Sequence, residues 1–190
     1  MTTEDPEADF IRRYTSDVAS LLRRLDPGPI ITAVSALHAA WQAGKVVLFC
    51  GNGGSGASCS HIVNDFQKGF GLKAICLNDS MPLVSTWAND TAWQNVFAPQ
   101  VTTWGEPGAI LVAVSGSGTS GNIIQAILVA KNADMVTVGL TGFDGGWVAT
   151  AVDHSLHVPT DSMQQAEDVH MVVLHLLYLG LKRRIEEKQS

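Results

Sequence analysis

Two loops rich in glycine and hydroxyl groups are the clearest sites for chemistry in this sequence. Residues 50–55 (Cys-Gly-Asn-Gly-Gly-Ser) follow the apolar run 46–49, and residues 115–122 (Ser-Gly-Ser-Gly-Thr-Ser-Gly-Asn) follow the apolar run 109–114. Glycine lets the backbone approach a ligand closely, and hydroxyls and free N–H groups at a helix N-terminus bind anions. The loops therefore predict a phosphate site built from dipoles rather than from cations.

The two loops could also be purely structural turns, but the second loop has more hydroxyl groups than a turn requires. A tight turn with Ser55 as the cap of the following helix would explain the first loop. The second loop carries four hydroxyls within six residues, where a helix cap needs only one. No Lys follows the glycines as in a Walker loop, and the glycine spacing is not that of a dinucleotide site. A phosphate-binding role is the better explanation of the pair.

A histidine and a carboxylate follow the first loop. His61 and Asp65 are four residues apart, which places them one turn apart on the same face of a helix. Such a pair can act as acid and base, or bind a metal together. It can equally be a hydrogen-bonded pair with no further role, and the spacing alone leaves these alternatives open.

A second group of ionisable residues lies near the C-terminus. Glu167, Asp168 and His170 precede an apolar stretch that contains His175. A lone histidine in such a stretch is more often a core residue than a catalyst, and carboxylates in a first helical turn are ordinary partners of the helix dipole. Glu167 and His175 are about 80° apart around a helix and about 12 Å apart along it. The two side chains can therefore reach a common site only if each points along the helix toward the other.

The elements that must position these residues alternate between strands and helices. An amphipathic helix is predicted over residues 8–25, a second ends near residue 43, and a long one closes the chain from about 162 to 188. Apolar runs this continuous are typical of strands buried on both faces, so we expect a doubly wound, flavodoxin-like α/β fold with a five-stranded parallel sheet. Ligands in such folds bind beyond the carboxyl ends of the strands, where both loops fall. The strands are predicted at residues 45–50, 73–77, 109–114, 135–140 and 154–158.

Composition excludes several classes of protein. The chain has 190 residues, 46% of them apolar and 16% charged, with a formal net charge of −6. It therefore has too few charges for a disordered chain and the wrong sign for a nucleic-acid-binding protein, and we expect one domain over residues 1–190. No apolar run is long enough to cross a membrane. Residues 1–5 are unlike a signal peptide, and the three cysteines form no disulfide or metal pattern, so we expect a cytoplasmic location.

In combination, these motifs resemble the sugar isomerase (SIS) superfamily, and within it the phosphoheptose isomerases. The resemblance rests on the two loops, on residues 140–146 (Leu-Thr-Gly-Phe-Asp-Gly-Gly), on the run 167–170 and on His175, in that order along the chain. It implies an SIS-domain fold and conversion of sedoheptulose 7-phosphate to D-glycero-D-manno-heptose 7-phosphate in heptose biosynthesis. It also implies a homotetramer with active sites near subunit interfaces, which would give residues 1–43 a role in oligomerisation.

The resemblance assigns roles to individual residues. Catalysis would fall to Asp65, His175 and Glu167, with either carboxylate as the base. One Zn²⁺ per subunit would be held by His61, Asp65, Glu167 and His175. The substrate and its phosphate would be bound by the two loops and by Asp90; the residues are Asn52, Gly53, Ser55, Asp90, Ser115, Gly116, Ser117 and Ser120.

The sequence departs from the family at two of these positions. Asp65 stands where the family has glutamate, and Glu167 stands where it has glutamine, which makes the predicted metal site more anionic. Lys68 is an imperfect counterpart of a basic residue in the family. A second hypothesis is therefore a non-catalytic SIS protein, either a phosphosugar sensor or a tetrameric scaffold that binds the replication initiator. His61 and His175 favour the enzyme, because a scaffold needs no histidine on each side of a pocket.

Overall fold

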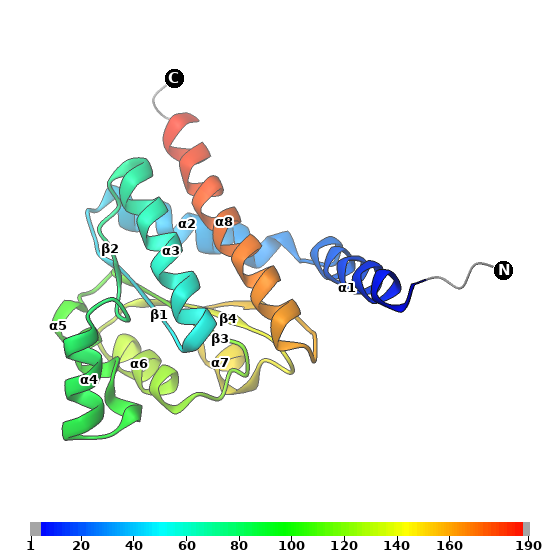
Figure 1. The fold of residues 1–190 in the computed structure, drawn as a ribbon. Helices are drawn as coiled ribbons and strands as arrows, with labels where there is room; N and C mark the ends of the chain where they lie inside the picture. The colour runs from blue at the N-terminus through cyan, green and yellow to red at the C-terminus, as the bar shows by residue number, and fades with distance from the viewer. Residues whose placement is uncertain (1–4, 188–190) are drawn as a thin grey trace.

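The sheet has the predicted number of strands, and all of them are parallel. A computed structural model describes residues 5–187, in which the strands follow the order β2-β1-β3-β4-β5 (Figure 1). This is the flavodoxin-like order, so the predicted fold class is confirmed. The strands are β1 Val47–Gly51, β2 Ala74–Cys76, β3 Ile110–Ser115, β4 Val136–Thr141 and β5 His154–His157.

Helices occupy the intervals between the strands, as predicted, and two precede the sheet. The α-helices are α1 Pro6–Arg23, α2 Pro27–Gln42, α3 Gly53–Phe70, α4 Met81–Asp90, α5 Ala98–Trp104, α6 Gly121–Asn132, α7 Gly146–Ala151 and α8 Met163–Glu187, with a 3₁₀ turn, η1, at Trp93–Asn95. Two predictions concern residues outside the described part of the chain. One is the end of the last helix at Lys188. The other is that residues 1–5, most of which are not described, do not resemble a signal peptide.

The sheet divides the core into two layers. Alternate residues of β1 point to opposite faces, so Val47 and Phe49 pack with α2, α3 and α8, while Leu48 and Cys50 pack with α5 and α6. Phe49 meets Phe66 of α3 with ring centroids 5.7 Å apart. Burial on both faces explains why the strands are apolar without alternation.

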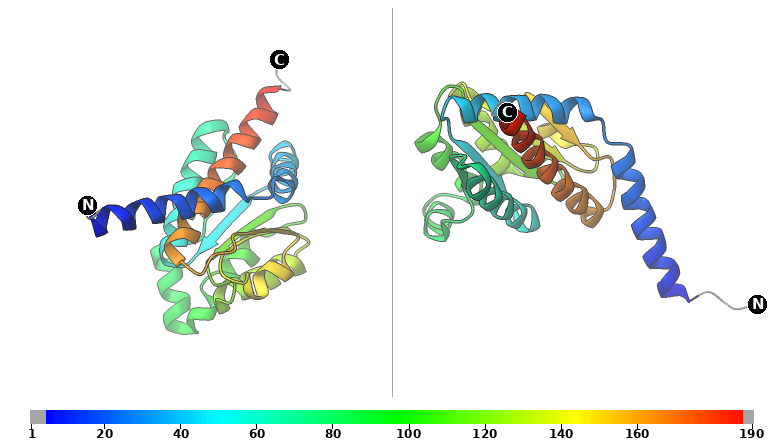
Figure 2. Two further views of the ribbon diagram at one scale, coloured as in Figure 1. Left: turned by 90° about the vertical axis from the view of Figure 1, so that its right-hand side faces the viewer. Right: turned by 90° about the horizontal axis from the view of Figure 1, so that it is seen from above.

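Helix α1 projects away from the body of the molecule (Figure 2). Its C-terminal part packs on the core through Leu21, and Tyr14 donates a hydrogen bond of 2.6 Å to Asp168 on α8. Phe10 and Ile11 are 63% and 58% exposed, which leaves the apolar face of α1 largely uncovered in one chain. Among the described residues, no helix is long and apolar enough to span a membrane.

All three cysteines are buried and unpaired. Burial raises the pKa of Cys76 to about 12 and that of Cys50 and Cys59 well above the usual thiol value. Thiolate, the reactive form, is therefore scarce at neutral pH.

We expect these thiols to be unreactive in the folded protein. An aromatic disulfide reagent at pH 8 should release no chromophore over minutes, because neither access nor ionisation is available. The same reagent in denaturant should titrate three thiols. Rapid reaction of the native protein would contradict the burial described above.

Candidate active site

The two predicted loops line one cleft at the carboxyl ends of neighbouring strands. β1 and β3 are paired in parallel, with Gly51 opposite Val114, so the loops that follow them lie side by side. The cleft has a volume of about 260 Å³. It is lined by Asn52, Gly53, Gly54, Ser55, Val114, Ser115, Gly116, Ser117, Ser120, Met163 and Glu167.

The first loop ends in the N-terminus of α3. Asn52 is the N-cap residue in an extended conformation, yet its side chain makes no capping hydrogen bond. Its amide instead exchanges two hydrogen bonds with Asn122, of 2.9 and 2.8 Å, and so ties the first loop to the second. Asn52 therefore has a structural partner at the position predicted to bind the sugar. The first amide groups of α3 have no acceptor within the helix, and Gly53, Gly54 and Ser55, which carry them, line the cleft.

The second loop is shaped by its own hydroxyls. Ser115 Oγ accepts a hydrogen bond of 3.2 Å from the Gly118 amide and lies 3.5 Å from Ser120 Oγ. Ser117 Oγ accepts from both the amide and the hydroxyl of Thr119, at 3.3 and 3.1 Å. The loop is therefore preorganised, with the three serines already facing the cleft.

A third segment supports the second loop from behind. The Gly142 amide donates to the Gly116 carbonyl at 2.8 Å, and the Val148 amide donates to the Gly118 carbonyl at 3.0 Å. Gly118 has a positive φ of 65° and packs directly on the backbone of Gly145. The sequence pattern left the role of residues 140–146 open. Their glycines are explained by this close backbone contact.

The first turns of α8 cover the cleft. A methyl group on Gly116 would lie 2.5 Å from Met163 Sδ, and one on Gly54 would lie 2.5 Å from Glu167 Oε1. Both glycines therefore give room to the ends of two flexible side chains of α8. Sequence reasoning missed Met163 because nothing in its residue type distinguishes it, although it is one turn before Glu167 on the same face.

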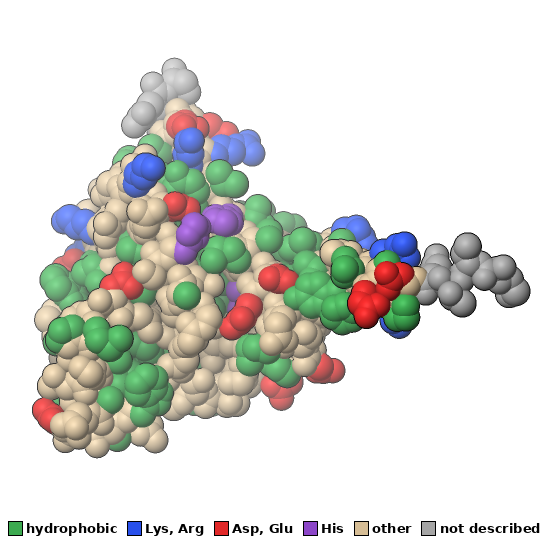
Figure 3. Space-filling model, viewed as in Figure 1, with side chains coloured by type: hydrophobic (Ala, Val, Ile, Leu, Met, Phe, Trp, Pro, Cys, Tyr) green, Lys and Arg blue, Asp and Glu red, His purple; other side chains and the backbone are tan. Residues whose placement is uncertain are grey.

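A second cluster of side chains lies further along the same two helices. His61 Nε2 of α3 is 3.2 Å from His175 Nε2 of α8, and Asp65 Oδ2 lies 3.6 and 3.9 Å from these two atoms. All three ligand atoms fall within 4.8 Å of one another. The space-filling view shows histidine side chains together on this face, between α3 and α8 (Figure 3). Two imidazoles and a carboxylate are ligands that zinc prefers, and three protein ligands leave a position open for substrate.

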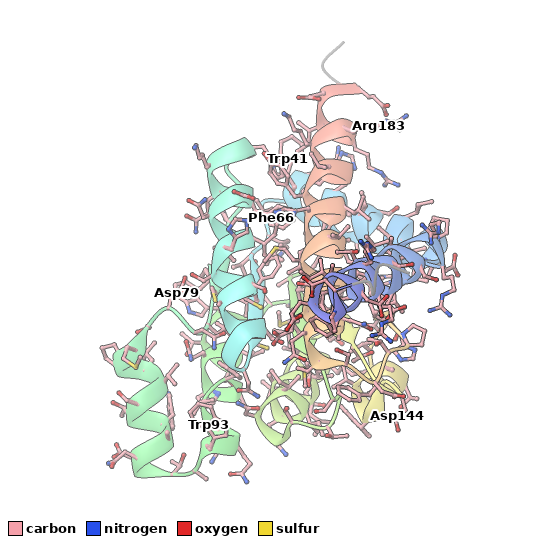
Figure 4. All side chains as sticks on the ribbon, turned by 45° about the vertical axis from the view of Figure 1, so that its right-hand side comes forward. Trp41, Phe66, Asp79, Trp93, Asp144 and Arg183 are labelled. Carbon is pink, nitrogen blue, oxygen red and sulfur yellow. The ribbon has the colours of Figure 1, made fainter. Side chains whose placement is uncertain are left out.

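Packing beyond the cluster fixes the two helices relative to each other. Phe66 of α3 and Tyr178 of α8 have ring centroids 5.7 Å apart, and Phe66 points into the core below these helices (Figure 4). His170 is buried among the same elements beside Thr141 of β4, and burial lowers its pKa, which keeps the ring neutral. Aromatic packing thus holds α3 and α8 together next to the histidine cluster.

The remaining predicted site residues lie elsewhere. Glu167 is not in the group of three and faces the cleft instead. Asp90 ends α4, where it accepts a hydrogen bond of 2.7 Å from Asn89, and it does not line the cleft of this chain. Lys68 lies in the last turn of α3, about 20 Å along the helix from Gly54.

Comparison with known proteins agrees with this arrangement. The model of the SIS domain family matches residues 13–142. A phosphoheptose isomerase of Geotalea daltonii is 34% identical over 180 residues, which cover 92% of this chain and 93% of that protein. One from Maridesulfovibrio salexigens is 36% identical over 152 residues, covering 77% and 74%. This chain belongs to the phosphoheptose isomerase family of SIS-domain proteins.

The solved structure of a phosphoheptose isomerase from Neisseria gonorrhoeae has the same fold. It superimposes with a TM-score of 0.86 at 26% identity, over 92% of this chain and 98% of that one. The share of the chain that superimposes is larger than the SIS-domain match, which ends at residue 142, before α8 with Glu167 and His175. The phosphoheptose isomerase fold therefore extends over both halves of the site.

The supporting contact behind the second loop can be tested with a matched pair of glycine variants. Gly118→Ala adds a methyl group against the Gly145 backbone at a positive φ, and should lower the free energy of unfolding by about 3 kcal/mol. Gly53→Ala has a similar φ of 54° but nothing within 4 Å, so it should cost only about 1 kcal/mol. Urea unfolding of both variants measures the difference. Equal losses would show that the loop does not depend on this contact.

Proposed function

We propose that this chain is an aldose–ketose isomerase that converts sedoheptulose 7-phosphate to D-glycero-D-manno-heptose 7-phosphate through an enediol. The observation that carries the proposal is the spacing of the serine cleft and the His61–Asp65–His175 cluster along one helix. Gly54 and His61 are seven residues apart on α3, a rise of about 10 Å. An extended seven-carbon chain also measures about 10 Å from its first carbon to its terminal phosphorus by ordinary bond lengths.

The phosphate end of the substrate is held by dipoles. Ser55, Ser115, Ser117 and Ser120 offer hydroxyls, and the first turn of α3 offers amide groups and the positive end of its dipole. A phosphate fixed there leaves the carbonyl end beside α3 and α8 at the cluster. Holding the reacting carbons in one place supplies a large part of the rate enhancement.

The carbonyl end meets one base and one acid. Asp65 removes a proton from C1, and His175 gives a proton to the oxygen on C2, which forms the enediol. The same groups then return a proton to C2 and remove the hydroxyl proton on C1, which gives the aldehyde. Asp65 is half-buried and within 3.9 Å of His175 Nε2, so both can reach adjacent carbons. Glu167 lies away from the cluster, and this favours Asp65 as the base.

The residues present fit a zinc ion. In a zinc-bound form, His61, Asp65 and His175 would hold the ion in place of the proton-transfer roles given above, and a bound Zn²⁺ would supply Lewis-acid polarisation of the substrate carbonyl. Glu167 is the fourth ligand that the family resemblance suggests. Its present position against Gly54 puts it outside the three-residue group.

We also propose that the enzyme is a cytoplasmic homotetramer assembled through the N-terminal helices, residues 1–43. Exposed apolar side chains on α1 and α8 support an interface there; they include Phe10, Ile11, Leu176 and Leu179. Unpaired cysteines fit a reducing compartment. Asp90 would then contribute to the site of a neighbouring subunit. The convergence of His61, Asp65 and His175 favours catalysis over a sensor or scaffold role.

Chain length of the substrate tests this proposal. We expect kcat/KM to fall about a hundredfold from sedoheptulose 7-phosphate to fructose 6-phosphate, and further to ribulose 5-phosphate. Each missing carbon displaces the carbonyl from the cluster by about 1 Å, and a displacement of this size costs about 10²-fold. Coupled assays of the three ketose phosphates, with zinc content measured on the same sample, give the comparison. Equal turnover of all three would refute the spacing argument.

Variants of the cluster test the assignment of roles. Asp65→Asn and His175→Ala should each reduce kcat by 10²–10⁴ with sedoheptulose 7-phosphate, because each removes a proton-transfer group. His154→Ala, on β5 and outside the cluster, is the matched control and should retain activity. Wild-type rates in both cluster variants would remove the proposed catalytic pair.

A further inference from the structure

Glu167 places a carboxylate inside the cleft that is proposed to bind phosphate. Its Oε1 and Oε2 lie 2.5 and 3.0 Å from the position that a methyl group on Gly54 would take, and the side chain is half-buried. Gly54 belongs to the first turn of α3, the same turn that carries Ser55. The carboxylate therefore lies on the surface that a phosphate would have to contact.

The charge of Glu167 is uncompensated by its neighbours in the cleft. All residues that line the cleft belong to the described part of the chain. Among them, Glu167 alone has a charged side chain, and none is Lys or Arg. Helix α3 has no acidic residue in its own first turn, and Asn52 does not cap it with its side chain. The Glu167 carboxylate thus lies beside the N-terminus of α3, where an acidic residue in the first turn of that helix would otherwise complement the helix dipole.

A phosphate dianion and this carboxylate compete for the same positive end of α3. Like charges a few ångströms apart repel by about 1 kcal/mol or more, even at high dielectric. We propose that Glu167 acts as a resident anion that weakens the binding of phosphate groups to the cleft. This inference rests on the proposed function, because it takes the cleft to be the phosphate site.

The consequence is that a phosphate group alone binds weakly in the cleft, whether it is free or part of a sugar phosphate. Inorganic phosphate has only the cleft to bind, so it carries the full repulsion. A heptose phosphate also contacts α3 and α8 along about 10 Å, and those contacts offset the repulsion. The repulsion lowers both affinities by the same factor, and the substrate retains affinity through contacts that inorganic phosphate lacks.

The test is the affinity of inorganic phosphate for the wild-type protein and for Glu167→Gln, measured by titration calorimetry at constant ionic strength. Glutamine keeps the size of the side chain and removes its charge, so we expect phosphate to bind at least tenfold more tightly. Asp161→Asn is the matched control: it removes the same charge from an exposed residue that is near Ser117 but outside the cleft lining, and it should change affinity less than twofold. Thermal melting verifies that each variant is folded.

Each outcome decides the inference. Unchanged or weaker phosphate binding by Glu167→Gln would overturn it, as would equal tightening by Asp161→Asn. A purely structural role of Glu167 would loosen the cleft and weaken binding, which is opposite in sign to the expected result. Absence of phosphate binding to every protein at 50-fold above the substrate KM would overturn the assignment of the cleft itself. The wild-type protein could fail to turn over sedoheptulose 7-phosphate while Glu167→Gln binds phosphate more tightly. That result would refute the proposed function and leave this inference standing.

Discussion

The packing of α3 against α8, with both helices running in the same direction, is the constraint on which the site depends. Contacts follow one another in the same order along both helices: Gly54 meets Glu167, His61 meets His175, and Gly69 meets Tyr178. Helix α3 contributes His61 and Asp65 to the cluster and α8 contributes His175, and each helix lines part of the cleft. A shift of one helix by a turn, about 5.4 Å, would separate the imidazoles and uncover the cleft at once.

Glycine leaves room for side chains in this packing. Gly54 and Gly69 let α8 approach α3 at its first and last turns, and Gly116 makes room for Met163. The sheet beneath supplies the register, because β1 and β3 end together and deliver their loops to the same edge. Anion recognition by amides and hydroxyls follows from this geometry and needs no cation from the lining of the cleft.

Much of this could be predicted from the sequence, for physical reasons that differ between residues. The strands, the helices and the convergence of both loops follow from apolar runs and from the rule that ligands bind at the carboxyl edge of parallel sheets. The pairing of His61 with Asp65 follows from helical spacing. The meeting of His61 with His175, 114 residues apart, depends on helix packing that no local pattern encodes. The same is true of Glu167, whose separation from the cluster reflects where α8 crosses Gly54.

A crystal structure of the protein soaked with sedoheptulose 7-phosphate tests the central claim most directly. The account predicts the phosphate oxygens within hydrogen-bonding distance of Ser55, Ser117 and Ser120, and C1 and C2 within reach of Asp65 and His175 at the far end of an extended chain. A sugar phosphate bound elsewhere, or one whose phosphate lies at the histidine cluster, would contradict it.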